Sequence, residues 1–227
     1  MLSMNRVGSL AFISRQVVLL RKRIMSETGL KVQSFETGAV RSTERQGFRY
    51  DLITPVALRA MATYYQVQPN WNNMSPDKHI SICLDFTYAF LANPGEQQNL
   101  YAATAALFHA VAAFEQEKYF ANEPFSNGDY NYHLIPRSAL KRVAAAYDEG
   151  AKKYSAFNCE KGMPVGDILN HAIAHLFDWL KGDTSEDHLG HACWNYLMAI
   201  HNLFMHPTID HGLRTTPLHM KGFDYGI

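Results

Sequence analysis

The feature that most limits the possible folds is an internal repeat of an apolar helical pattern. The segment YDLITPVALRAMATYY, residues 50–65, has its counterpart in YHLIPRSALKRVAAAY, residues 132–147. Tyr, Leu, Ile, Ala and Leu recur in the same order, and each segment ends in Tyr. The regions that follow, 70–114 and 157–203, share Asn, Pro, an apolar run, a polar turn and a second apolar run. The repeated order predicts a three-helix unit that occurs twice, as a fused pseudo-dimer.

Apolar spacing and helix breakers predict a secondary structure that is almost entirely helical. Prolines and their polar neighbours indicate helices that begin near residues 55, 75, 136 and 164. Another helix is expected over roughly 96–117. The last helix is expected to begin near Thr184, because Asp183 and Glu186 have the spacing of a capping box. Strand-like alternation is absent over any useful length. We therefore predict an all-α helical bundle built from two similar three-helix units.

The repeat also sets the predicted boundaries along the chain. They are a basic N-terminal arm at 1–35, a degenerate first helical repeat at 36–118, a connecting loop at 119–131, a second helical repeat carrying the site at 132–206, and a C-terminal tail at 207–227. The first 26 residues contain no acidic residue, which is typical of a disordered arm or of an organellar targeting peptide.

The composition excludes several classes of protein. Lys and Arg number 21, as do Asp and Glu, so the chain lacks the positive charge of a general nucleic-acid or membrane-surface binder. No apolar run is long enough to cross a bilayer. Cys83, Cys159 and Cys193 have no CxxC spacing, which excludes a zinc finger and indicates reduced thiols. We expect a cytoplasmic protein.

Titratable residues form two stripes on the last two predicted helices. Helical positions three or four apart share a face, so residues 167, 171, 175 and 178 line one stripe and 187, 191 and 195 line another. The short connection KGDTS makes the helices pack antiparallel, with the stripes facing each other. Buried ionisable groups need partners or a metal ion. We expect a metal or phosphate site, and the alternative is a hydrogen-bonded structural network. The stripes consist of Asp167, His171, His175, Asp178, Asp187, His191 and Asn195.

A polar segment at the end of the preceding helix, DEGAKKYSAFNCEKG, extends this group. Glu149 is placed to reach the two stripes. The cations and the amide that would bind phosphate are Lys152, Lys153, Asn158 and Lys161. The alternative is a solvated basic helix end that complements the helix dipole. His188 lies off the stripe that contains Asp187 and is a weaker candidate for the site. Surface positions are expected for His201, His206, His211 and His219.

Five motifs carry a resemblance to a known family. They are ETGAVRS (36–42), FRYDLITP (48–55), EGAKKY (149–154), KGMPVGDILNHAIAHL (161–176) and GDTSEDHLGHACWN (182–195). They resemble the dATP/dGTP diphosphohydrolase N-terminal domain family of phages and bacteria. That family is similar to the MazG-like, all-α nucleoside triphosphate pyrophosphohydrolases. The resemblance covers residues 36–55 and about 132–203.

The resemblance implies hydrolysis of a (deoxy)nucleoside triphosphate to a monophosphate and pyrophosphate with a divalent metal: Mn, Mg, Co or Zn. Imidazoles with carboxylates suit Mn, Co, Zn or Fe, whereas a clear preference for Mg needs an all-oxygen site. The expected catalytic residues are Glu149, His175 and Asp187, with Glu149 or His175 as the base. The expected metal ligands are Glu149, His171, His175, Asp178, Asp187, His191 and Asn195.

Two other functions stay open from the sequence. One is a catalytically inactive helical protein of phage type that binds nucleotides or packs against a partner through the aromatic-rich loop FANEPFSNGDYNYHL. The other is a metal-dependent phosphohydrolase that acts on a different phosphate ester. We expect a small-molecule nucleotide as the partner, with no direct nucleic acid and no membrane. Assembly as a homo-oligomer is not decided by the sequence.

Overall fold

The computed structural model describes residues 32–34, 36–37, 39–42, 48–67, 74–117 and 132–218. The chain divides into two compact units, 1–47 and 48–227. In the first unit, strands β1 (Val32–Ser34) and β2 (Val40–Ser42) pair antiparallel, with Val32 opposite Ser42. The sequence analysis did not predict this strand pair. Most of the predicted basic arm, and the predicted connecting loop at 119–131, lie outside the described residues.

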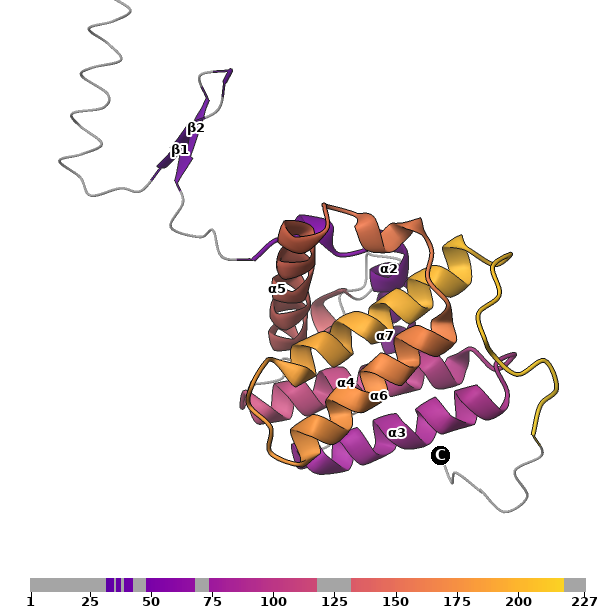
Figure 1. The fold of residues 1–227 in the computed structure, drawn as a ribbon. Helices are drawn as coiled ribbons and strands as arrows, with labels where there is room; N and C mark the ends of the chain where they lie inside the picture. The colour runs from indigo at the N-terminus through magenta and orange to yellow at the C-terminus, as the bar shows by residue number, and fades with distance from the viewer. Residues whose placement is uncertain are drawn as a thin grey trace, which may run out of the picture. The chain divides into compact units, whose positions relative to one another are not determined.

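The second unit is helical, so the predicted all-α class is confirmed (Figure 1). Its elements are the 3₁₀ turn η1 (Tyr50–Leu52), α2 (Pro55–Val67), α3 (Pro76–Ala92), α4 (Gln98–Phe114), η2 (Tyr132–Leu134), α5 (Arg137–Lys153), η3 (Asn158–Lys161), α6 (Val165–Leu180) and α7 (His188–Met205). No helix in the described part of the chain has the length and apolar character needed to cross a bilayer.

Prolines mark the helix starts that the sequence predicted. Pro55 and Pro76 are the first residues of α2 and α3, while Pro136 and Pro164 directly precede α5 and α6. A proline fits there because the first turn of a helix does not use its backbone N–H groups. The four predicted starts are thus confirmed to within a residue or two.

The predicted start of the last helix near Thr184 is wrong, because α7 begins at His188. Asp183 and Glu186 form no capping box. The Asp183 side chain instead accepts a hydrogen bond from the Ser185 backbone N–H at 2.7 Å, which closes a turn before the helix. Asp187 is the N-cap, and its carboxylate accepts a hydrogen bond from the Gly190 N–H at 3.1 Å.

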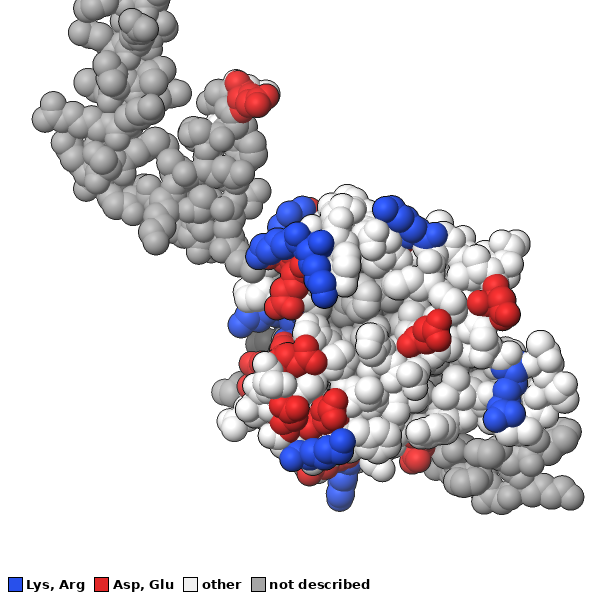
Figure 2. All heavy atoms as spheres, viewed as in Figure 1, with Lys and Arg blue, Asp and Glu red and all other residues white. Residues whose placement is uncertain are grey.

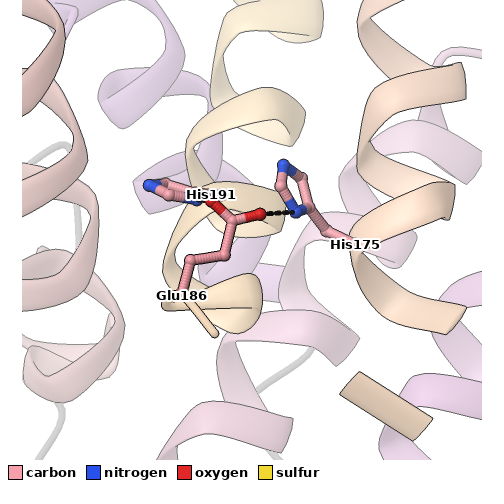
Figure 3. Close-up of side chains that lie close together, drawn as sticks. All are labelled: His175, Glu186 and His191. Atoms are coloured by element: carbon pink, nitrogen blue, oxygen red, sulfur yellow. Dashed lines mark ion pairs between the residues drawn. The ribbon is translucent and has the colours of Figure 1, made fainter. Parts of the chain in front are cut away.

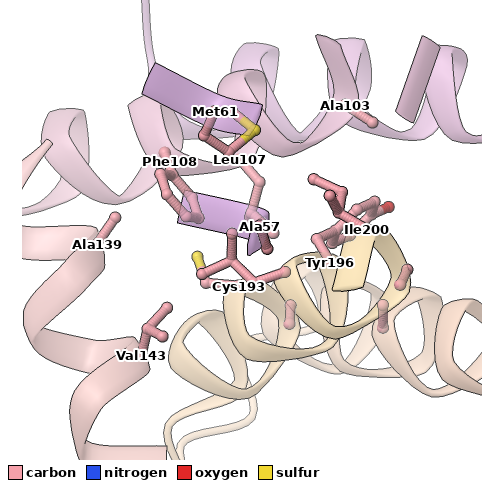
Figure 4. Close-up of a cluster of buried hydrophobic side chains, with 14 of the residues drawn as sticks. Ala57, Met61, Ala103, Leu107, Phe108, Ala139, Val143, Cys193, Tyr196 and Ile200 are labelled. Carbon is pink, nitrogen blue, oxygen red and sulfur yellow. The ribbon is translucent and has the colours of Figure 1, made fainter. Parts of the chain in front are cut away.

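Two helices, α4 and α7, pack against each other at the centre of the core. Residues 102–112 of α4 and 195–202 of α7 are buried without interruption. The many alanines of α4 allow close approach of its neighbours on every side. Figure 4 shows Met61 of α2, Phe108 of α4, Val143 of α5 and Tyr196 of α7 around one part of this core. A helix that is apolar all round must be covered by others, which explains the two central positions.

The contacts between helices follow the repeat. α2 packs against α4 and α7, and α5 packs against α7 and α4. η1 packs against α5, while η2 packs against α2. Exchanging the two halves turns each of these contacts into another one. This is the pattern that a duplicated three-helix unit would produce, although duplication itself stays a prediction.

The histidines near the C-terminus are not all on the surface, as the sequence analysis expected. His201 is 5% exposed, and its Nδ1 lies 2.6 Å from the Thr54 hydroxyl. α7 carries this residue into the core because the helix stays buried through residue 202. His206 is half-buried against the Glu160 carbonyl at 2.8 Å, and His211 is also half-buried. His219 lies outside the described residues.

Burial of His109 in α4 predicts a pH-dependent stability. Desolvation, with a smaller effect of His79, lowers the pKa of His109 from 6.5 to about 3. The unfolded chain therefore takes up this proton first as the pH falls. The stabilisation is complete above pH 6.5 and is lost toward pH 3, by at most about 1.4 kcal/mol per pH unit. We expect His109→Leu to flatten the dependence of the unfolding free energy on pH in this window, measured by urea denaturation. The exposed His171→Leu serves as control, and equal slopes for both variants would contradict the prediction.

Candidate functional site

A cavity of about 520 Å³ opens between α5, α6, α7 and η3. Its lining contains aromatic side chains as well as titratable and amide side chains. The aromatic members include Tyr154, Phe157 and Trp194. The titratable and amide members are Glu149, His171, His175, Glu186, His191, Asn158 and Asn195. Three helices and their connections thus bring residues from 149 to 195 to one surface.

Glu186 lies in the connection between α6 and α7 and contacts a histidine on each of these helices. Its Oε1 is 3.3 Å from His175 Nδ1, and its Oε2 is 3.1 Å from His191 Nδ1. Figure 3 shows the carboxylate between the two rings, with His175 on α6 and His191 on α7. The antiparallel packing of α6 and α7 places the rings on facing helices, with ring centroids 5.2 Å apart.

His188 adds a buried ring behind this group. It is 4% exposed, and its Nδ1 lies 3.1 Å from His175 Nδ1 and 3.4 Å from Glu186 Oε1. Its Nε2 lies 3.6 Å from Asp183 Oδ1, beyond ordinary hydrogen-bond distance. His188 and His191 are three residues apart and share one face at the start of α7.

Glu149 at the end of α5 reaches the outer side of His191. Its Oε2 is 3.3 Å from His191 Nε2. Both nitrogens of the His191 ring therefore face carboxylates. A neutral imidazole has a single N–H, so one of these two contacts requires a second proton or a cation between the atoms. The Asn195 amide donates to the His191 carbonyl at 2.9 Å, one turn along α7.

Burial shifts the pKa of His175, the imidazole that contacts both Glu186 and His188. Desolvation lowers the pKa of His175 below the usual value for histidine, and the neighbouring Glu186 opposes this effect. His191, His188 and His171 lower it further, because a second positive charge beside them is unfavourable. The neutral imidazole favoured here is the form that binds metal ions.

The structure brings together only some of the residues that the sequence singled out. Glu149, His175 and His191 are in the central group, while His171, Lys153, Asn158 and Asn195 line the cavity around it. His171 packs beside His175, one turn earlier on α6, with ring centroids 5.9 Å apart. Lys153 lies over the ring of Tyr154, 5.1 Å from its centroid.

Other predicted residues are engaged elsewhere. Asp178 pairs with Lys181 at 3.3 Å near the end of α6, and Lys152 pairs with Asp148 at 2.5 Å on the surface of α5. Lys161 donates to the Asn158 side chain at 3.1 Å. None of Asp167, Asp178, Asp187, Lys152 and Lys161 is among the residues lining the cavity. The three aspartates were placed on the stripes by helical spacing alone, which takes no account of nearer partners such as Lys181 for Asp178.

Asp187 anchors the start of α7. Besides capping the helix, its carboxylate pairs with Arg142 of α5, and Arg142 also pairs with Glu115 at 2.5 Å. Gly190 makes this packing possible. A Cβ atom at residue 190 would lie 2.5 Å from Asp187 Oδ2 and 3.1 Å from Arg142 Cβ, which is too close. The Asp187 carboxylate is thus occupied by the helix terminus and by Arg142.

Glu186 and His188 both contact His175, but Glu186 was not predicted as a site residue and His188 was given less weight. Glu186 was assigned to a capping box because the last helix was expected to begin near Thr184, whereas His188 was set aside because it lies off the stripe that contains Asp187. The signal that could have found them is the i, i+3 spacing of His188 and His191, which share a face at a helix start. A residue that directly precedes an N-cap lies beside that first turn, which is the position of Glu186.

The donor set fits a divalent metal ion. One ligand atom each from His175, Glu186 and His191 lies within 4.8 Å of the others. Two imidazoles with a carboxylate are ligands for Zn, Mn, Co or Fe. All three residues line the cavity, so a bound ion would be open to a ligand there.

Residues 120–211 match the model of a family described as dATP/dGTP diphosphohydrolase, N-terminal. The predicted resemblance to this family is confirmed over that segment. The match includes α5, α6 and α7, and therefore all the residues of the central group. No curated protein and no solved structure matches the chain.

Substitution of Asp187 tests its structural role. Asn is as good an N-cap as Asp, so Asp187→Asn should preserve α7 and lose only the charge pairing with Arg142. Asp187→Ala should lower the free energy of unfolding by about 0.5–2 kcal/mol through the lost cap. Urea denaturation of both variants measures the difference. An Asp187→Asn protein as destabilised as Asp187→Ala would contradict the assignment of Asp187 as a cap.

Proposed function

We propose that this protein is a metal-dependent (deoxy)nucleoside triphosphate pyrophosphohydrolase that releases pyrophosphate from dATP- or dGTP-like substrates. The observation that carries the proposal is the coincidence of two independent features. The segment that matches a family named for this hydrolysis is the same segment that forms a carboxylate–imidazole group on the wall of a cavity.

The size and character of the cavity support a nucleotide ligand. Its volume of about 520 Å³ lies within the usual range for small-molecule sites. The aromatic lining residues Tyr154, Phe157 and Trp194 offer flat apolar surface for a base, and the polar lining residues offer donors and acceptors for phosphates. Leu52 of η1 completes the lining, so the first half of the bundle contributes to the cavity.

The charges around the cavity also suit a triphosphate. Figure 2 shows basic side chains gathered near the end of α5 and acidic side chains below them, toward the α6–α7 connection. Lys153 lines the cavity, and Lys161 orients the Asn158 amide beside it. Cations and amides of this kind would stabilise the charge that develops on departing pyrophosphate.

The residues that would hold the metal are His175 and Glu186, with a further imidazole from His188 or His191. When bound there, a divalent ion neutralises phosphate charge and lowers the pKa of a coordinated water. Glu186 keeps its two oxygens directed at imidazoles on different helices, which fixes its orientation before any ligand arrives. Pre-arranged charges are the main source of catalysis in phosphoryl transfer.

Glu149 is the better candidate for the general base. His175 Nδ1 faces both Glu186 and His188, so this nitrogen is engaged within the group. The Glu149 side chain is 68% exposed and lines the cavity, with only His191 as its polar contact in the described part of the site. It would accept a proton from the water that attacks the α-phosphorus, as pyrophosphate leaves on the opposite side.

Removing the carboxylate of Glu149 tests this assignment. Incubation with each deoxynucleoside triphosphate and with Mn²⁺, Co²⁺, Zn²⁺ or Mg²⁺ in turn, with pyrophosphate release as readout, should show activity of the wild-type protein with at least one of these ions. Glu149→Gln keeps the shape of the side chain and removes the base, so kcat should fall by about 10²–10⁴-fold.

Asp148→Asn is the matched control, because Asp148 is the adjacent residue and pairs with Lys152 on the surface. It should retain wild-type activity. Equal losses in both variants would contradict the role of Glu149. Nucleotide binding without pyrophosphate release from the wild-type protein would contradict the proposed hydrolysis altogether.

A further inference from the structure

We infer that His175, Glu186 and His188 form a pre-arranged binding site for a zinc-class transition-metal ion, with a further coordination position open to the cavity. The inference deepens the proposed function, since the ion would be the one used there. It replaces a general divalent site with a defined ligand set and a preference against Mg²⁺.

The distances among the three ligand atoms carry the inference. His175 Nδ1 lies 3.1 Å from His188 Nδ1 and 3.3 Å from Glu186 Oε1, and the third side of the triangle measures 3.4 Å. Tetrahedral zinc bonds of about 2.0–2.1 Å separate neighbouring ligand atoms by about 3.3–3.4 Å. The triangle therefore already has the dimensions of one face of a tetrahedral site.

The short distance between the two Nδ1 atoms also supports a cation-binding site. Two unprotonated imidazole nitrogens 3.1 Å apart repel each other, so a proton or a cation must lie between them. The neighbouring Glu186 oxygen supplies the negative charge that stabilises a cation there. His188 is 4% exposed, and a buried polar ring is costly unless its nitrogens have partners, so a cation at Nδ1 would stabilise it.

The outer contacts orient the three ligands. Within the described part of the chain, His188 Nε2 has no hydrogen-bond partner, but Asp183 Oδ1 lies 3.6 Å away on its outer side. The negative charge of this carboxylate would favour the tautomer that carries its N–H on Nε2, which leaves Nδ1 unprotonated toward His175 and Glu186. His191, through Nδ1, holds the second oxygen of Glu186 at 3.1 Å.

The open position faces the cavity because the ligands differ in exposure. His188 is the buried ligand of the metal site and does not line the cavity, whereas His175 and Glu186 do. Three protein ligands with one position left open is the arrangement of catalytic zinc sites, and two histidines with a glutamate is one of their ligand sets. Mg²⁺ prefers six oxygen ligands and has little affinity for such a set.

Metal binding can be measured on the full-length chain without nucleotide, after chelator treatment. Calorimetry should show one Zn²⁺ per chain and far weaker binding of Mg²⁺. Co²⁺ should produce the strong visible absorption of a four-coordinate ion rather than the weak absorption of an octahedral one. Mg²⁺ that binds as tightly as Zn²⁺, or an octahedral Co²⁺ spectrum, would overturn the inference.

Variants then assign the ligands. His188→Ala should weaken Zn²⁺ binding at least about tenfold and change the Co²⁺ spectrum. Since His188 is buried, Asp183→Asn provides a second test on an exposed residue, with a loss of about tenfold. His206→Ala, at the opposite end of α7, should bind Zn²⁺ as the wild type does. Wild-type affinity in a folded His188→Ala protein would overturn the inference.

The two proposals fail separately. Pyrophosphate release supported by Mg²⁺, from a protein that binds no Zn²⁺ or Co²⁺, would refute the proposed zinc-class site and leave the proposed hydrolase activity supported. Tight, four-coordinate Co²⁺ binding with no release of pyrophosphate from any nucleotide would support the proposed zinc-class site and refute the proposed hydrolase activity.

Discussion

The anchoring of α7 by its N-cap residue is the constraint on which the rest of the site depends. Asp187 caps the helix and pairs with Arg142 of α5, which in turn pairs with Glu115 just after α4. These contacts tie the start of α7 to elements of both halves of the bundle. The first turn that carries His188 and His191 therefore has a fixed position, and Glu186 directly precedes it.

Burial explains why such an anchor is needed. α7 is buried along most of its length, and its first turns border the cavity between α5, α6 and η3 through His191, Trp194 and Asn195. The helix cannot move along its axis without exposing apolar residues such as Tyr196 or Leu197. The proposed chemistry therefore uses the part of this central helix that lines a cavity.

Much of this arrangement could be predicted from the sequence. Proline positions and apolar spacing gave the helix order and the starts of α2, α3, α5 and α6. The pairing of α6 with α7 followed from their short connection, and it led to the expectation that His175 faces His191. These predictions succeed because they depend on local backbone chemistry and on the period of the helix.

The rest could not be predicted because it depends on competition between partners. Asp178 and Lys152 have the right residue types, but each has a nearer partner of opposite charge on its own helix. Asp183 has the spacing of a helix cap, yet its side chain closes a turn with Ser185 first. Spacing lists the side chains that can meet, and the energies of rival contacts decide which of them do.

The two halves of the bundle each have a glutamate just before a central helix, and the partners of these two carboxylates differ. Glu96 lies two residues before the first residue of α4, and Glu186 lies two residues before the first residue of α7. In the first half the carboxylate accepts hydrogen bonds from the amides of Asn93 and Asn99, at 2.9 and 3.3 Å. In the second half the equivalent carboxylate meets imidazoles. A carboxylate satisfied by amide N–H groups has no need of a cation, whereas one facing imidazole lone pairs creates a place for one. The side chains around these two carboxylates therefore differ, and the imidazoles around Glu186 are what favours the proposed metal ion in the second half.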